Sequence, residues 1–270
     1  MSRVSGLVRA CHPEPTLAVT LIVTALAQAA GARTGWVFAA FLSGQLTTGW
    51  TNDYLDRARD AATRRPDKPL VRGDLTPRAL ALAAGLAGCA CVPLSLAMGW
   101  RAGLAHLLAV ASAFGYNAGL KATAASFVPY AVSFGLVPSV IALGTPAHRW
   151  APWWATAAGV LLGVGAHLAN TLPDLADDAA TGVRGLPHRL GARVGAALAA
   201  LLLLAATGLL VFGPGRPGRL GLLALAVAAA VTATGLVLAR RDGSRAAFQA
   251  ALVVAALGVA TLLARGTALT

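Results

Sequence analysis

Nine long apolar segments dominate this sequence and restrict the folds open to it. A membrane-spanning helix needs about 20 mostly apolar residues. Only 12% of the residues are charged and 57% are hydrophobic, and the mean hydropathy is +0.69. A soluble domain carries about 25% charged residues. We therefore expect an all-α membrane protein whose nine transmembrane helices form one bundle. The expected spans are 15–32, 35–52, 76–97, 101–121, 127–146, 151–173, 192–212, 219–239 and 245–264.

The Lys and Arg residues gather on one side of the expected membrane topology. Of the 22 basic residues, 16 lie in the N-terminal segment and in the loops after spans 2, 4, 6 and 8. Cytoplasmic loops carry such an excess, so these segments, with the N-terminus, are expected to be cytoplasmic. The same rule explains the net charge of +12 without a nucleic-acid partner. A composition rich in Ala, Gly and Arg favours a bacterial inner membrane.

Acidic residues mark the cytoplasmic end of the second span. Asn52, Asp56 and Asp60 follow one another at intervals of four, so on a helix they share one face. Two carboxylates at this spacing repel each other unless a cation lies between them. Mg²⁺ prefers oxygen ligands, and it is usually held by a few carboxylates together with substrate phosphates. The pattern therefore indicates half of a magnesium–diphosphate site.

The same pattern returns 118 residues later. Asn170, Asp174 and Asp178 have the same spacing at the end of the sixth span, and residues 60–63 and 178–181 both read DAAT. We interpret this as an internal duplication within a single membrane domain, residues 1–270, with halves at roughly 15–121 and 127–239 and a ninth helix after them. One acidic triplet could be an ordinary solvated helix end. Two matching copies favour a shared metal site.

Basic residues follow both acidic patterns. Arg65 and Lys68 come after the first, and Arg184 and Arg189 come after the second. Arg and Lys are suited to neutralise phosphate oxygens that a metal leaves uncovered. Ionisable groups near membrane depth are costly and indicate a functional site.

These motifs resemble those of the UbiA-type intramembrane prenyltransferases. Residues 52–60 read NDYLDRARD and residues 174–178 read DLADD, similar to the family's NDxxDxxxD and DxxxD motifs. The stretches RPDKP (65–69), LPHRLG (186–191) and YNAGLK (116–121) also look like family sequence. The resemblance covers about residues 35–195.

The resemblance implies nine helices around a central, lipid-open cavity, and Mg²⁺-dependent ionisation of a prenyl diphosphate. It implies that two Mg²⁺ ions bind to metal-site residues, and that further residues contact the diphosphate. Asp53 and Asp177 would point away from the metal and hold loop cations. The metal-site residues are Asn52, Asp56, Asp60, Asp174 and Asp178; the diphosphate contacts are Arg65, Lys68 and Lys121.

Three more residues are candidates for the substrate site. His167 and Asn170 share a face with Asp174, and His167 is either a base near the acceptor or a packed polar residue. The Tyr116 ring is suited either to cation stabilisation or to interfacial anchoring.

The expected activity is transfer of a prenyl group to a lipophilic acceptor, aromatic or quinone-like. A terpene cyclase of the same superfamily would use the same ionisation machinery. A lipid carrier or transporter built on duplicated halves is the third reading, but it does not need twin metal motifs. Acceptor identity, prenyl chain length and oligomeric state have no signature in the sequence.

Overall fold

The chain forms a helical bundle in a computed structural model that describes residues 3–63, 65–238, 249–250, 253–254, 256–258 and 260. Within these residues there are helices and no strands. The α-helices are α1 (Arg3–Ala10), α2 (Pro13–Ala30), α3 (Thr34–Ala62), α4 (Pro69–Arg72), α5 (Pro77–Leu96), α6 (Trp100–Asn117), α7 (Val128–Leu143), α8 (Trp153–Thr171), α9 (Leu175–Ala180), α10 (Leu186–Phe212) and α11 (Arg219–Leu238). Two 3₁₀ turns are η1 (Leu120–Ala122) and η2 (Leu172–Asp174).

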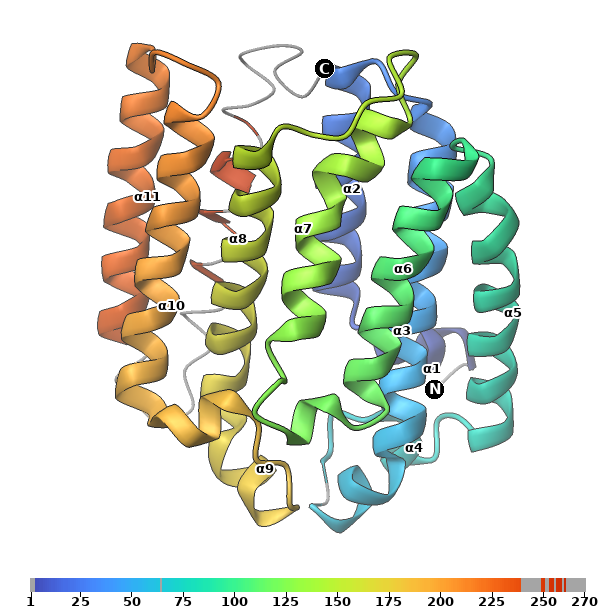
Figure 1. Cartoon of the computed structure of the whole chain (residues 1–270). Helices are drawn as coiled ribbons and strands as arrows, with labels where there is room; N and C mark the ends of the chain where they lie inside the picture. Colours follow the sequence, from blue (N-terminus) through green and yellow to red (C-terminus); the bar gives the residue numbers. More distant parts are fainter. Residues whose placement is uncertain are drawn as a thin grey trace.

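Each long helix packs on the next one along the chain, and α11, α10, α8 and α7 stand side by side on the left of Figure 1. Helix α8 packs between α7 and α10, α6 packs on α7, and α3 packs on both α2 and α5. The ends of α3 and α9, with the short helix α4, lie together at one end of the bundle, the lower end in Figure 1. This end carries the acidic motifs.

The composition of the helices identifies an integral membrane protein. Four helices in the described part of the chain are long and apolar enough to cross a membrane, or five if α1 and α2 count as one span bent by 65°. On α5 and α11 most residues of the apolar window are not covered by protein. Exposed leucines on these helices, such as Leu82 and Leu223, are suited to lipid.

Helices α7 and α8 approach closely because small residues lie between them. A Cβ atom added at Gly159 would lie 2.5 Å from the carbonyl oxygen of Phe134, and one at Gly135 would lie 2.7 Å from Val160 Cγ2. Lipid tails are as apolar as the helices, so the hydrophobic effect does not hold helices together in a membrane. Small residues instead let the two backbones approach closely enough for van der Waals packing. This contact fixes α8, whose C-terminal end continues into the second acidic motif.

The all-helical membrane fold expected from the sequence is confirmed, and eight of the expected spans coincide with helices. Helix α3 extends ten residues beyond the expected span 35–52, so the first acidic motif is part of one continuous helix. Most of the ninth expected span, 245–264, lies outside the described residues. The count of nine helices and the central cavity therefore stay predictions.

The two acidic motifs differ in shape, although their sequences match. The first motif continues its span as one helix, whereas the second follows an interruption. There α8 stops at Thr171, η2 follows, and α9 begins at Leu175. Pro173 causes the break, because proline lacks the N–H and its ring clashes with the preceding turn. The corresponding position of the first motif holds Leu55, which leaves α3 intact.

Candidate functional site

The first motif lies on the last turns of α3, with its acidic side chains turned into the protein. Asp56 and Asp60 are 7% and 4% exposed. The Asp56 carboxylate accepts a hydrogen bond from Arg59 Nη2 at 2.7 Å and another from Lys121 Nζ. A buried carboxylate is stable only when it is paired in this way, so Asp56 is satisfied by two cations.

Asp60 lacks such partners. No side chain in the described part of the chain donates a hydrogen bond to its carboxylate, although the residue is buried. An uncompensated buried charge is strongly destabilising. Asp60 is therefore a place where an added cation would stabilise the protein.

The second motif is spread over three elements because of the break at Pro173. Asn170 is on α8, Asp174 ends η2, and Asp178 lies on α9. The Asp174 and Asp178 side chains are 38% and 20% exposed, so this half is more open than the first. Nε2 of His188, at the start of α10, lies 3.6 Å from Asp178 Oδ2.

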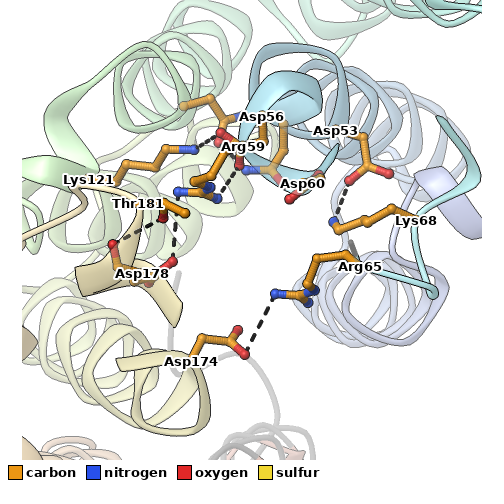
Figure 2. A network of polar contacts seen from close by, with 12 residues as sticks. Asp53, Asp56, Arg59, Asp60, Arg65, Lys68, Lys121, Asp174, Asp178 and Thr181 are labelled. Carbon is orange, nitrogen blue, oxygen red and sulfur yellow. Dashed lines mark hydrogen bonds and ion pairs between the residues drawn. The ribbon is translucent and has the colours of Figure 1, made fainter. Parts of the chain in front are cut away.

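Two arginines of the first half join the two motifs (Figure 2). Arg59 Nη1 lies 3.7 Å from Asp178 Oδ1, and Arg65 Nη1 lies 3.8 Å from Asp174 Oδ1. Arg65 also donates to Asp67, and this hydrogen bond raises the pKa of the guanidinium, so Arg65 stays charged. The two acidic motifs thus face each other, with the guanidinium groups of Arg59 and Arg65 between them.

Sequence reasoning missed Arg59. It lies three residues after Asp56, so a helix brings the two side chains together. That spacing was visible in the sequence, but its second partner, Asp178, comes from the other half of the chain and could not be read from local spacing.

The donors at this end of the bundle suit magnesium. No group of three or more His, Cys, Asp or Glu residues gathers closely enough to hold a metal within the described residues. Mg²⁺ does not need such a cage, since it is usually bound by one or two carboxylates plus substrate phosphates and water. Buried Asp60 and the neighbouring Asp56 offer hard oxygen ligands, and Asp174 and Asp178 offer them from the other side. The residues therefore fit a metal shared with a phosphate ligand.

Lys121 reaches the site from the turn after α6. Its ammonium contacts the Asp56 carboxylate, and its side chain is 11% exposed. Burial lowers the pKa of this lysine, while the charge of Asp56 opposes the shift. Lys121 is thus placed beside the acidic motif, and the diphosphate contact that the resemblance implies stays a prediction.

Lys68 pairs with Asp53, the acidic residue that was expected to hold a loop cation. Its ammonium donates to Asp53 Oδ1 at 2.6 Å, and His12 Nε2 lies 3.0 Å from the same oxygen. Asp53 and Lys68 are 2% and 8% exposed. Figure 2 shows this pair beside the first motif, on the side away from Asp178. The pair ties the loop after α3 back to α3, and His12 at the start of α2 joins the same carboxylate, which favours a structural role for Lys68.

The remaining candidates form an aromatic cluster beside the acidic end. The His167 ring centroid lies 5.7 Å from that of Tyr116 and 4.8 Å from that of Tyr130. His167 Nε2 is 3.0 Å from Ser126 Oγ, and its buried Nδ1 has no hydrogen-bond partner among the described residues. Asn170 interacts with the Tyr130 hydroxyl. Tyr130 was not predicted, because only packing of α7 on α8 brings it here.

Comparison with known proteins places the chain among membrane prenyltransferases. Residues 14–254 match the model of the UbiA prenyltransferase family. No curated protein sequence matched the chain.

Solved structures share the fold at low sequence identity. The apo structure of a UbiA homolog from Aeropyrum pernix K1 superimposes with a TM-score of 0.73, at 18% identity, over 93% of this chain and 98% of that chain. A UbiA homolog from Archaeoglobus fulgidus bound to DMAPP and Mg²⁺ gives 0.70 at 17% identity, over 95% and 99%. A structure of a digeranylgeranylglyceryl phosphate synthase gives 0.69 at 15% identity, over 98% of both chains.

Proposed function

The chain belongs to the UbiA prenyltransferase family, and on that premise we propose that it transfers a prenyl group from a prenyl diphosphate to a lipophilic acceptor in a Mg²⁺-dependent reaction. The acceptor class that we propose is aromatic or quinone-like. The observation that carries the proposal is the meeting of the two acidic motifs, with Asp56 and Asp178 on either side of Arg59.

The residues at this meeting point have complementary tasks. Asn52, Asp56 and Asp60 would hold magnesium from the first half, and Asp174 and Asp178 from the second. Bound magnesium would neutralise charge that develops on the diphosphate as the allylic C–O bond breaks. Two ions, one for each half, fit the two donor sets. The Mg²⁺ and DMAPP bound to the Archaeoglobus homolog support the same ligand chemistry.

The basic residues would bind the diphosphate itself. Lys121 and Arg65 already contact the acidic motifs, so a diphosphate that joins these motifs through metal would lie within reach of both cations. Charge-assisted hydrogen bonds to phosphate are about twice as strong as neutral ones. These side chains would hold the leaving group in place and keep it charged after it departs.

The apolar helices would protect the allylic cation. Tyr116, Tyr130 and His167 cluster beside the acidic end, where aromatic faces could stabilise positive charge. A surrounding bundle of apolar helices excludes water that would otherwise capture the cation. His167 Nδ1, which is buried and has no partner in the part of the chain that the structure describes, is our candidate for accepting a proton from the acceptor.

We place the active site on the cytoplasmic side, in a bacterial inner membrane. The support is the bias of basic residues, of which 16 of 22 lie on that side of the expected topology.

Release of diphosphate tests the proposal. The purified enzyme in nanodiscs would be given prenyl diphosphates of increasing length, with Mg²⁺ or with EDTA. We expect Mg²⁺-dependent release that Asp56→Asn and Asp174→Asn each reduce at least about 100-fold, since each removes a charged metal ligand. Asp177→Asn is the matched control, because Asp177 is exposed and adjacent to the second motif. Mg²⁺-independent release, or release that survives both substitutions, would refute the proposal.

The products separate transfer from the alternatives. Mass spectrometry of lipid extracts with and without added quinone-like acceptors would show a prenylated acceptor if the enzyme is a transferase. A cyclic hydrocarbon formed from the diphosphate alone would instead identify a terpene cyclase. Prenyl diphosphate that binds but is never hydrolysed or transferred would indicate a carrier.

A further inference from the structure

Asn117, the last residue of α6, connects this helix to the first motif through two hydrogen bonds. Its Nδ2 donates to the backbone carbonyl oxygen of Thr48 at 3.0 Å, and its Oδ1 accepts from Asn52 Nδ2, also at 3.0 Å. Asn117 is 6% exposed. No motif in the sequence suggested this contact.

The backbone carbonyl fixes the direction of both amide groups. A carbonyl oxygen can only accept a hydrogen bond, so the Asn117 atom facing Thr48 must be the NH₂ group. The oxygen of Asn117 is then at the other end of its amide, where it can only accept. The Asn52 atom facing it must therefore be the NH₂ group too, and Asn52 Oδ1 is left pointing away from Asn117.

That orientation matters for metal binding. An amide can ligate Mg²⁺ only through its oxygen, and a free Asn side chain has no preference between its two ends. No described residue donates a hydrogen bond to Asn52 Oδ1. Lys121 makes a parallel contact to Asp56, one turn further along α3, so the segment from α6 to η1 supports both residues of this face.

We propose that Asn117 is a positioning residue that presents the oxygen of Asn52 to the magnesium site. It acts as a relay: the Thr48 carbonyl orients Asn117, and Asn117 orients Asn52. The inference rests on the proposed function, because it takes Asn52 as a metal ligand. Groups that orient metal ligands through hydrogen bonds typically change metal affinity by about 10–100-fold when removed.

The test is a double-mutant cycle read by metal binding rather than by turnover. Mn²⁺ affinity would be measured by electron paramagnetic resonance, with inorganic diphosphate present, for the wild type, Asn117→Ala, Asn52→Asp and the double variant. We expect Asn117→Ala to weaken Mn²⁺ binding at least about tenfold in the wild-type background. In the Asn52→Asp background the same change should cost less than about threefold, because a carboxylate presents an oxygen in either orientation.

A second variant protects the test against misfolding. Asn117→Ser keeps a small polar side chain but is too short to reach either the Thr48 carbonyl or Asn52, so it should bind Mn²⁺ as weakly as Asn117→Ala. Thermal unfolding of each variant reports on folding separately. Equal losses of affinity in both backgrounds would overturn the relay and leave Asn117 as a packing residue. Absence of Mn²⁺ binding by the wild type would instead overturn the magnesium site itself.

Discussion

Arg59 Nη1 lies 3.7 Å from Asp178 Oδ1, so a guanidinium from the first half of the chain faces a carboxylate from the second. The same guanidinium donates to Asp56 at 2.7 Å. Arg59 therefore lies between the two acidic motifs, where a metal–diphosphate group would have to bind. A cation of the protein and a cation from solution would compete for the same carboxylates.

Replacing Arg59 with Gln should shift this competition toward the metal. Without Mg²⁺ the variant should melt about 2–4 °C lower, since partly exposed ion pairs contribute about 1 kcal/mol at most. With Mg²⁺ and diphosphate, its melting temperature should rise by more than that of the wild type, because a ligand that binds more tightly stabilises more. Arg57→Gln is the control on the same helix, since Arg57 is exposed and stacks on Tyr54. An equal Mg²⁺ response in all three proteins would contradict the prediction.

Lys121→Met should weaken substrate binding. We expect the KM for prenyl diphosphate to rise about 10–100-fold, because a charged hydrogen bond is worth about 1.5–3 kcal/mol. Lys121→Arg keeps the charge and should recover part of the loss. Steady-state kinetics of diphosphate release would measure both. If Lys121→Met leaves KM unchanged, Lys121 serves only as a counter-ion for Asp56.

Lys68→Met should affect stability more than binding. The change leaves Asp53 buried without its ammonium partner, which typically costs about 3–5 kcal/mol. The double variant Asp53→Leu and Lys68→Met should recover most of that loss, since apolar replacements for buried ion pairs are often neutral. Denaturation in mixed micelles measures these changes. A raised KM with unchanged stability would favour the sequence-based prediction that Lys68 contacts diphosphate.

Gly159→Ala and Gly85→Ala should have opposite effects. The added methyl group at Gly159 meets the Phe134 carbonyl oxygen at 2.5 Å, whereas nothing lies within 4 Å of one at Gly85. We expect Gly159→Ala to destabilise the protein by about 1–3 kcal/mol, as overpacking does. Gly85→Ala should be neutral or stabilising by up to about 1 kcal/mol, because alanine is the better helix former. The melting temperature of each variant, compared with that of the wild type, would measure these effects. Equal changes in melting temperature would argue against close packing of α7 and α8.

Local patterns predicted the helices and the first motif well. The spacing of Asn52, Asp56 and Asp60 needs only a continuous helix, and α3 provides one. Contacts between distant segments could not be predicted in this way. The partners of Arg59, Lys68 and Asn117 depend on how α2, α6 and α9 pack around α3, and helical periodicity contains no information about that packing.

The break at Pro173 makes the two acidic ends unlike each other. Two copies that arise by duplication begin identical, and identical copies meeting at a two-fold axis would make a symmetric site. A prenyl diphosphate has one charged end and one hydrocarbon end, so the two sides of its binding site must differ. Pro173 in the second motif, where the first has Leu55, interrupts the second acidic end with a 3₁₀ turn, and this end is the more exposed of the two. If the two motifs descend from one ancestral half, position 173 is one at which they have diverged.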